Sequence, residues 1–405
     1  DELAALVDTY GAVVLDKAVV RLSKPNPRYL MGAGNAEELS HRAKELQANL
    51  IVFDEELSPS QQRNWEQLTR CRCVDRQEII LDIFSHRATT KEAELQIELA
   101  QSEYMLPRLK RAWTHLSRQQ GGVGVRGGEG EKQIEIDSRL VRRRIAHLKE
   151  ELRQVEKRRA EQRKKRRKRP VPNAAIVGYT NAGKSSLFNK LTQSEVLVED
   201  KLFATLDPTT RRLILPNNQV LLLTDTVGFV RKLPHGLVEA FKATLEEAVI
   251  ADYVIHVVDA SSPLALEHYE TTLRVLEEIG AENARETLTI FNKIDLVEHK
   301  YEIFRLRRRF PEALFVSVHT GEGLDEVIAA CEQLISHEMQ TVSLCIPQER
   351  YDLVAWLHRE CLVEEERQEH NGVYLTASVP VDRVRDLACY LENPEDAMSQ
   401  PEMFV

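Results

Sequence analysis

The feature that most constrains this chain is an eight-residue stretch at positions 178–185, which reads GYTNAGKS. It matches the pattern G-x-x-x-x-G-K-S, in which two glycines let the backbone curl so that successive N–H groups point at phosphate oxygens. An apolar run at 174–177 precedes the stretch, and residues 186–191 follow it with helical spacing. A loop between a strand and a helix adds the positive end of the helix to the same phosphate site. The stretch therefore predicts an α/β domain that binds a nucleotide.

Two side chains of this loop have individual expected roles. Lys184 should reach the β- and γ-phosphates, where it acts as a catalytic charge, and the Ser185 hydroxyl should ligate Mg²⁺. We expect the whole loop to contact phosphate, which gives the predicted contacts Gly178, Tyr179, Thr180, Asn181, Ala182, Gly183, Lys184 and Ser185.

A second motif follows the apolar residues 220–223 and reads D-x-x-G. Asp225 is expected to hold Mg²⁺ through water, and the Gly228 N–H is expected to sense the γ-phosphate. We predict that the motif as a whole faces the nucleotide, through Asp225, Thr226, Val227 and Gly228.

Two further segments predict that the base is guanine. An N-K-x-D motif follows the apolar residues 287–291, and its Asp295 can accept both hydrogens that guanine presents at N1 and its exocyclic amine. Adenine lacks that donor pair, so ATP would leave the carboxylate without partners and would bind less tightly. The next apolar run, 314–316, leads into a segment whose backbone should contact the guanine oxygen. The expected base contacts are Asn292, Lys293, Ile294, Asp295, Ser317, Val318 and His319.

These motifs stand in order along the chain, each at the end of a predicted strand, where ligands bind in open parallel sheets. The segment at 203–210 lies between the first two and reads FATLDPTT. One threonine here should complete the Mg²⁺ shell only when the γ-phosphate is present, which makes the segment a switch. The residues alone do not choose among Thr205, Thr209 and Thr210.

The residue after the D-x-x-G glycine bears on the rate of hydrolysis. Many GTPases carry a glutamine there that orients the attacking water, whereas this chain has Phe229. A phenyl ring cannot hydrogen-bond water, so we predict slow hydrolysis by the protein alone. A partner could accelerate it by reshaping the switches, and Arg231 and Lys232 are nearby polar candidates.

Charge is unevenly distributed along the chain. Residues 139–169 hold 16 Lys and Arg against 4 Glu, a net +12, which leaves −21 for the rest of a chain whose total is −9. Charges of one sign packed this closely repel one another until they are neutralised, and this favours contact with nucleic-acid phosphates. Aromatic residues make up only 6% of the chain, so double-stranded or folded RNA is a better match than single strands.

Composition excludes several other classes of protein. Apolar residues make up 42% of the chain and charged residues 29%, and no apolar run approaches the ~20 residues of a membrane span. The six cysteines contain no C-x-x-C pair, so we expect reduced thiols rather than a zinc site. No signal peptide is recognisable. We therefore expect a cytoplasmic protein without a membrane span, and a monomer.

The expected organisation is a multidomain α/β protein in four parts. Residues 1–90 predict a small α/β domain, with strands at 13–15 and 50–53 and helices at 35–46, capped by Asn35, and 58–68, capped by Ser58. Residues 91–170 predict a basic antiparallel helical hairpin. Residues 171–340 predict the P-loop domain with a mostly parallel central sheet. Residues 341–405 predict a second small α/β domain, either a docking surface or a cap, with helices at 351–360 and 381–391.

The hairpin is predicted from two apolar seams with spacings of three and four. They are joined by a tip at 121–130 in which six of ten residues are glycine. Gly122, Gly124 and Gly127 match G-x-G-x-x-G, but a polar helix precedes them where a dinucleotide site requires a strand. The tip is either a slim loop that enters a narrow crevice or a flexible connector. The seam residues are Leu95, Leu99, Leu106, Leu109, Trp113 and Leu116, then Val141, Ile145, Leu148, Leu152 and Val155.

Taken together, several segments resemble the HflX family of translational GTPases. They are FATLDPTTR at 203–211, DTVGF at 225–229, NKID at 292–295, FDEELSPSQQRN at 53–64, LDIF at 81–84 and the glycine-rich tip. The resemblance covers at least residues 25–340. It implies that Thr205 is the switch threonine that ligates Mg²⁺ and takes part in catalysis. It also implies that the neighbours Phe203, Ala204, Leu206 and Asp207 line the nucleotide site. Finally, it implies binding to the large ribosomal subunit and its rRNA, and splitting of ribosomes under stress.

Two alternatives remain open at this stage. The chain could be a GTP-gated protein-interaction switch that uses the hairpin as a docking arm, in which case binding would depend weakly on salt. It could also be an RNA-remodelling NTPase that uses ATP, a reading that Asp295 disfavours.

Overall fold

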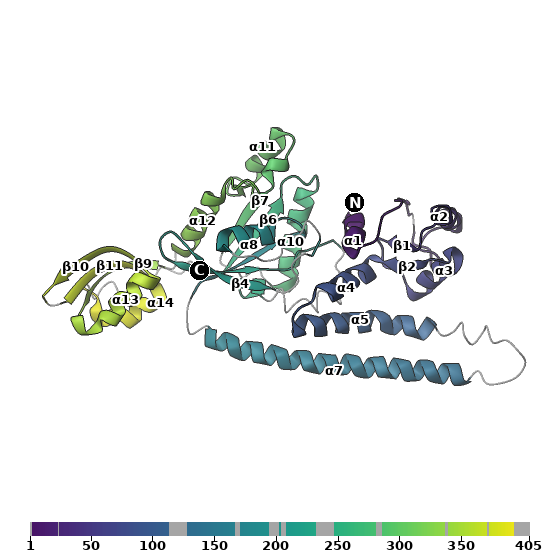
Figure 1. Cartoon of the computed structure of the whole chain (residues 1–405), viewed down its shortest axis with the longest axis horizontal. Coiled ribbons are helices and arrows are strands. Elements are labelled where there is room, and N and C mark those ends of the chain that lie inside the picture. The colour runs from purple at the N-terminus through teal and green to yellow at the C-terminus, as the bar shows by residue number, and fades with distance from the viewer. Residues whose placement is uncertain are drawn as a thin grey trace, which may run out of the picture. The chain divides into compact units, whose positions relative to one another are not determined.

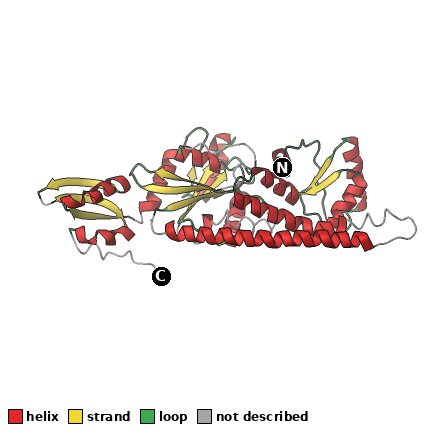
Figure 2. Cartoon of the chain, turned by 60° about the horizontal axis from the view of Figure 1, so that its bottom comes forward, coloured by secondary structure: helices red, strands yellow, loops and turns green. Residues whose placement is uncertain are grey.

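The computed structural model describes residues 2–22, 24–112, 128–166, 171–193, 202–203, 208–231, 247–280, 286–336, 339–370 and 372–392 (Figures 1 and 2). The chain divides into two compact units. The first contains the described residues up to 162 together with 202–203 and 229–231, and the second contains the others. Each unit is described by itself.

The first unit begins with a small α/β domain whose two strands pair in parallel. Its core surrounds the fully buried Trp65, which packs against Phe53 and donates its indole N–H to the Tyr29 carbonyl at 2.9 Å. Ser58 caps a helix as predicted, because its hydroxyl accepts the Gln61 N–H while the Gln61 side chain accepts the Ser58 N–H. The elements are α1 (Glu2–Tyr10), α2 (Ala33–Glu45), β1 (Leu50–Phe53), α3 (Pro59–Thr69), β2 (Arg72–Asp75) and α4 (Arg76–Arg87).

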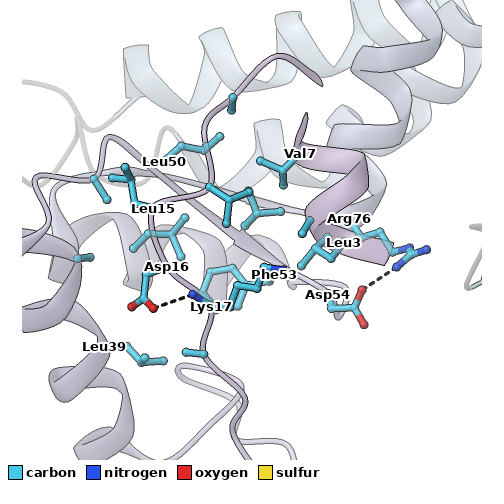
Figure 3. A pocket seen from close by; sticks show the side chains of 18 of the residues that line it. Leu3, Val7, Leu15, Asp16, Lys17, Leu39, Leu50, Phe53, Asp54 and Arg76 are labelled. Carbon is cyan, nitrogen blue, oxygen red and sulfur yellow. Dashed lines mark hydrogen bonds and ion pairs between the residues drawn. The ribbon is translucent and has the colours of Figure 1, made fainter. Parts of the chain in front are cut away.

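Two predictions for this domain were wrong. Residues 13–15 do not form a strand, and the exposed fractions of Val13 and Leu15 are 84% and 56%. Among the described residues β1 pairs only with β2, so this segment has no ladder to join. It lies beside a cavity of about 1120 Å³ that also borders β1 (Figure 3). The helix predicted from Asn35 begins earlier, at Ala33, and Gly32 takes the cap position without a side-chain hydrogen bond.

The predicted helical hairpin is present in the first unit. Its helices α5 (Lys91–Ala112) and α7 (Gly128–Arg166) lie side by side and run in opposite directions (Figure 1). Ion pairs join them from Arg144 to Glu98 at 2.7 Å and from Lys149 to Glu103 at 2.8 Å, and Leu148 of the predicted seam is fully buried. The end of the predicted tip, 128–130, is helical, and residues 121–127 lie outside the described residues. The helix also extends well past the end of the apolar seam, to Arg166 in the basic run.

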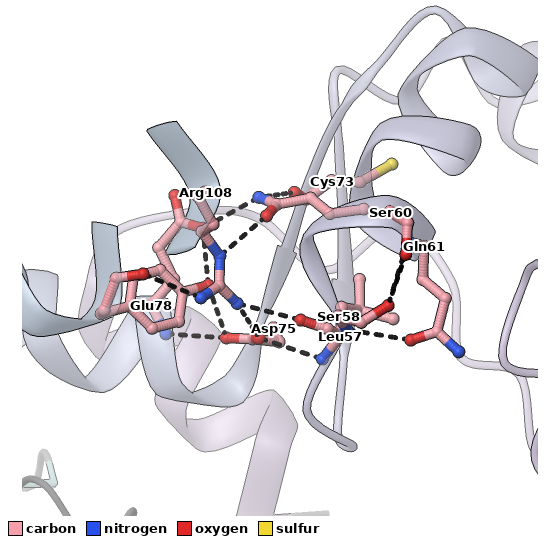
Figure 4. Close-up of polar contacts among 10 residues, drawn as sticks. Leu57, Ser58, Ser60, Gln61, Cys73, Asp75, Glu78 and Arg108 are labelled. Carbon is pink, nitrogen blue, oxygen red and sulfur yellow. Dashed lines mark hydrogen bonds and ion pairs between the residues drawn. The ribbon is translucent and has the colours of Figure 1, made fainter. Parts of the chain in front are cut away.

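A buried polar network joins α5 to the small α/β domain (Figure 4). At its centre, the fully buried Asp75 carboxylate caps α4 by accepting the Glu78 N–H at 3.0 Å. It also accepts hydrogen bonds from the Leu57 N–H, the Tyr104 hydroxyl and the Arg108 guanidinium, at 3.0–3.1 Å. Arg108 further donates to the Leu57 carbonyl at 3.0 Å. Because buried charges require partners, this set of contacts fixes the C-terminal part of α5, the end nearer the hairpin tip, on the small α/β domain.

The second unit contains a six-stranded sheet in the order β4-β5-β3-β6-β7-β8. All neighbouring pairs are parallel except β4 with β5, so the predicted mostly parallel sheet is confirmed. Apolar side chains from alternate strand positions pack on both faces, for example Ile255 on one and Val258 on the other. The elements are β3 (Asn173–Gly178), α8 (Lys184–Thr192), β4 (Thr209–Ile214), β5 (Val220–Asp225), β6 (Tyr253–Asp259), α10 (Ala265–Ile279), β7 (Glu286–Asn292), η3 (Ile294–Leu296), α11 (Lys300–Arg309), β8 (Leu314–Phe315) and α12 (Leu324–Ser336).

The antiparallel edge strand β4 was not predicted. It takes Thr209 and Thr210 out of the expected switch loop and pairs them with Asp225 and Thr224. The Thr210 hydroxyl lies 2.9 Å from that of Thr224, on the neighbouring strand. Neither threonine is therefore in a loop, and Thr205 stays the predicted switch residue although it lies outside the described residues.

The C-terminal part of the chain forms a three-stranded antiparallel sheet in the order β10-β11-β9, covered by helices. The helix at Tyr351–Glu360 was predicted with these bounds, whereas β10 was missed and the helix predicted at 381–391 changes to 3-10 geometry at Arg385. No helix among the described residues is both long and apolar enough to span a bilayer. The elements are β9 (Met339–Ile346), η4 (Gln348–Arg350), α13 (Tyr351–Glu360), β10 (Leu362–Glu369), β11 (Gly372–Pro380), α14 (Val381–Val384) and η5 (Arg385–Tyr390).

Candidate nucleotide-binding site

The loop at 178–185 joins β3 to α8, as predicted. Its glycines are required by both space and backbone angle. A Cβ on Gly178, whose φ is +149°, would lie 2.1 Å from the Val257 carbonyl oxygen. A Cβ on Gly183, whose φ is +93°, would lie 2.2 Å from Nδ2 of Asn292. With Asn181 also at positive φ (+60°), the loop turns tightly enough to aim its N–H groups inward.

Lys184 is held inside this loop. Its side chain is 6% exposed, and its Nζ donates to the Tyr179 carbonyl at 2.9 Å. Burial lowers the pKa of Lys184 to about 8, while the Asp225 carboxylate acts in the opposite direction. The ammonium group is thus a buried cation with few contacts, which phosphate oxygens would stabilise.

A set of oxygen ligands suited to Mg²⁺ lies beside Lys184. The Ser185 hydroxyl donates to the Asp225 carboxylate at 2.7 Å, and Asp225 is fully buried. Mg²⁺ prefers hard oxygen ligands, usually one or two from the protein together with phosphate and water. No group of three or more His, Cys, Asp or Glu among the described residues could hold a metal. The Ser185 hydroxyl fits a direct ligand of a Mg²⁺ ion that Asp225 would hold through water, with nucleotide and further water completing the shell.

The D-x-x-G segment packs closely against the phosphate loop. Thr226 is fully buried, and its hydroxyl donates to the Ile176 carbonyl in β3 at 2.7 Å. A Cβ on Gly228 would lie 2.8 Å from both Lys184 Nζ and Thr180 Cα. Only glycine fits at this position, which brings the backbone of the D-x-x-G segment close to Lys184.

Asn292 connects the phosphate loop to the predicted base loop. The side chain is 2% exposed, and its Nδ2 donates to the Ala182 carbonyl at 2.9 Å. Its Oδ1 accepts the Val318 N–H at 3.1 Å. One amide group therefore ties together segments that are more than 100 positions apart in the chain.

The other base-site residues lie at the carboxyl ends of β6, β7 and β8. Lys293 has a left-handed backbone (φ +63°) and forms an ion pair with Asp259 at 2.9 Å. Asp295 is exposed, so its carboxylate is open to a base, whereas the neighbouring Ile294 is buried. Ser317 and Val318 are buried, whereas His319 is exposed.

The switch residues are described only in part. Phe203 has a left-handed backbone (φ +58°), and its ring is buried edge-on against Phe84 of α4 at 4.5 Å, within the first unit. Phe229 is also buried, at 1% exposure, so its ring does not reach the solvent that supplies the attacking water. Ala204, Thr205, Leu206, Asp207 and Lys232 lie outside the described residues.

Two contacts of the site were missed from the sequence. The Tyr179 ring stacks on His268 of α10, with centroids 3.9 Å apart and planes at 9°. No motif marks His268, so no sequence signal could have found it. Asp259, the partner of Lys293, ends a predicted strand, and a carboxylate at that position was a usable signal.

The chain matches four family models in succession. They are described as GTP-binding GTPase N-terminal (residues 1–85), GTP-binding GTPase Middle Region (87–166), 50S ribosome-binding GTPase (173–293) and HflX C-terminal domain (304–395). Together they account for most of the chain.

Individual relatives agree with these matches. The chain is 47% identical to a GTPase HflX of Akkermansia muciniphila, covering 96% of this chain and 92% of the relative. It is 42% identical to GTPase HflX of Escherichia coli, covering 94% and 89%. A GTP-binding protein of Sulfolobus solfataricus, solved with GDP, is 26% identical over 83% of this chain and 95% of its own, with a TM-score of 0.44. The identity to full-length relatives, over nearly the whole chain, decides the assignment: the chain belongs to the HflX family of GTPases.

Proposed function

We propose that this chain binds GTP with Mg²⁺, hydrolyses it slowly when alone, and uses its basic arm to bind the large ribosomal subunit and separate ribosomes into subunits. In this proposal Ser185 and Thr205 ligate Mg²⁺, and Lys184 and the Gly228 N–H stabilise the γ-phosphate. The protein acts as a monomer in the cytoplasm, where a stress that stalls ribosomes creates the need for it.

The observation that carries the proposal is the presence, in one chain, of a guanine-nucleotide site and a long basic helix. The helix α7 extends into a segment, 139–169, whose net charge is +12, while the remainder of the chain is acidic. An acidic protein is repelled by RNA except through such a segment. The match of residues 173–293 to a family described as 50S ribosome-binding GTPase supports the large subunit as the partner.

Sedimentation of intact ribosomes with the protein tests the proposal. We expect the protein to move with large subunits, and the peak of intact ribosomes to fall, when GTP or a non-hydrolysable analogue is present. With GDP both effects should be much weaker. The non-hydrolysable analogue shows whether splitting needs GTP hydrolysis or only GTP binding. If the analogue supports splitting, binding is sufficient. Equal ribosome affinity in the empty, GDP and GTP forms would falsify the coupling.

Two matched variants sharpen the experiment. Replacing Lys and Arg at 163–169 by Gln removes seven positive charges and leaves the 178–185 loop unchanged. This variant should bind GTP normally and fail to bind large subunits. Lys184→Ala, with the arm intact, should lose the nucleotide dependence. If the first variant still splits ribosomes, the arm is a protein-docking element, as in the alternative of an interaction switch.

A further inference from the structure

We propose that the outward stripe of α11 is a second RNA-binding surface that takes unpaired bases. The helix spans Lys300–Arg309 and precedes the edge strand β8 (Figure 1). Its inner face packs into the core through Leu306, with Ile303 and Phe310 beside it. The opposite face carries Tyr301, Phe304, Arg305 and Arg308, whose spacing of three, one and three places them on one stripe.

Exposure of the two aromatic rings is the first observation. The exposed fractions of Tyr301 and Phe304 are 68% and 62%, whereas most aromatic side chains in the described part of the chain are buried or half-buried. Exposed apolar groups that gather at one place mark interaction sites more often than single exposed residues do. Residues at i and i+3 hold their Cβ atoms about 5–6 Å apart, so the two rings offer neighbouring platforms.

The charge of the helix identifies the partner. Five of its ten residues are Lys or Arg and one is Glu. Two arginines are used internally, since Arg309 pairs with Glu270 at 3.6 Å and Arg307 lies over the Phe315 ring at 5.0 Å. The structure gives Arg305 and Arg308 no acidic partner among the described residues, and both are exposed. They are available to phosphates.

Aromatic rings flanked by arginines are the combination that binds single-stranded RNA. Bases stack on the rings and phosphates pair with the cations, whereas the bases of a duplex are already stacked on one another. A second copy of the chain is a poorer partner for this surface. Two-fold pairing would place Arg305 and Arg308 of one copy near the same arginines of the other, and these positive charges would repel one another. The stripe shares no residue with the basic arm, whose composition suits folded RNA.

Fluorescence anisotropy with a labelled 12-nucleotide poly-U tests this surface without ribosomes. The double variant Tyr301→Ala/Phe304→Ala should weaken binding about tenfold or more, because each stacked base contributes measurably. Tyr301→Phe should restore most of the affinity lost by Tyr301→Ala. Arg305→Gln/Arg308→Gln should reduce the slope of log affinity against log salt by about 1.4, as two phosphate contacts on a single strand require.

Controls separate this inference from the proposed function. Tyr351→Ala removes a ring of similar exposure, 54%, from another helix and should have no effect. A 12-base-pair RNA duplex should bind the aromatic variant as it binds the wild type, while the arm variant loses the duplex. The inference is overturned if poly-U binding by the aromatic variant stays within twofold of wild type. It is also overturned if the aromatic substitutions only dissociate a dimer in sedimentation velocity, or if a polyglutamate of equal charge binds this stripe as tightly as poly-U.

Discussion

At the scale of single residues, the site depends on a few polar groups whose neighbours are fixed by the backbone. Asp295 is the residue expected to select the base, because its exposed carboxylate can accept two hydrogens from guanine. Asp295→Asn replaces one acceptor by a donor, so GTP affinity should fall by about 2–3 kcal/mol, roughly 30- to 150-fold. Affinity for xanthosine triphosphate, which presents an acceptor at that position, should rise. Titration with fluorescent nucleotides measures both, and Asp325→Asn, an exposed carboxylate of α12, is the control.

Lys184 makes a prediction about pH. Its pKa in the folded, nucleotide-free protein is about 8, below the usual 10.5, because burial disfavours the charged form. The unfolded chain therefore binds more protons between these values, and the free energy of unfolding rises with pH across this window. Relative to Lys184→Met, the wild-type protein should gain about 2 kcal/mol of stability between pH 7 and pH 9.5. Urea unfolding of both proteins without nucleotide at the two pH values measures this difference. A loss of wild-type stability relative to Lys184→Met between pH 7 and pH 9.5 would contradict a buried cation at Lys184.

At the scale of secondary-structure elements, the contact between the C-terminal part of α5 and the small α/β domain is the clearest case for a stability test. Asp75→Ala leaves the Arg108 guanidinium without its buried partner and removes the cap of α4. Breaking such a pair costs about 3–5 kcal/mol, whereas Arg144→Ala breaks an exposed pair between the two hairpin helices and should cost less than about 1 kcal/mol. Urea unfolding followed by Trp65 fluorescence, with Trp113 and Trp356 replaced by Phe, compares the two. Equal losses would mean that the network is not a buried charge site.

The sequence predicted the elements that carry motifs or apolar periodicity. Strands β3, β5, β6 and β7 are apolar runs that end at a recognisable turn or polar motif, so both their type and their ends could be read. It missed β4 and β10, because an edge strand exposed to water does not need an apolar pattern. β10 reads LVEEERQE, and six of its eight residues are exposed. The prediction for residues 13–15 was wrong for the opposite reason. Their apolar side chains predict a strand, but among the described residues no strand lies beside them to pair with.

For the site, the sequence predicts a role for each motif, but it does not predict the contacts between motifs. The expected roles of Lys184, Asp225 and Gly228 follow from residue type and spacing. The stacking of Tyr179 on His268, and the packing of Phe203 on Phe84, depend on how distant segments meet in three dimensions. No local pattern encodes either contact.

At the scale of the whole molecule, the rate of GTP hydrolysis should depend on the partner. Phe229 is buried and offers no hydrogen bond to water, so this position does not supply the group that orients the nucleophile in many GTPases. Large ribosomal subunits should accelerate turnover at least tenfold, by an amount that falls steeply with salt. A phosphate-release assay with and without subunits measures this. Equal rates would mean that the chain already supplies the missing group.

Salt dependence also tests how the arm binds. If residues 163–169 contact phosphates, replacing them by Gln should lower the slope of log affinity against log salt by several units, at about 0.9 per contact for a duplex. Replacing the exposed Arg367 and Arg385 of the C-terminal part by Gln is the control, and should leave the slope unchanged. A slope that is small in the wild type would instead favour a protein partner.

The single side chain of Asn292 has a consequence for ligands that lack a base. The Asn292 amide is hydrogen-bonded to Ala182 of the phosphate loop and to Val318 of the predicted base loop. The same side chain therefore positions both the segment expected to bind phosphate and the segment expected to bind guanine. Tripolyphosphate, which never touches the base pocket, should therefore bind Asn292→Ala less tightly than it binds the unaltered protein. Guanosine, which lacks phosphates, should also bind Asn292→Ala less tightly than the unaltered protein, because the substitution disturbs the base loop as well as the phosphate loop.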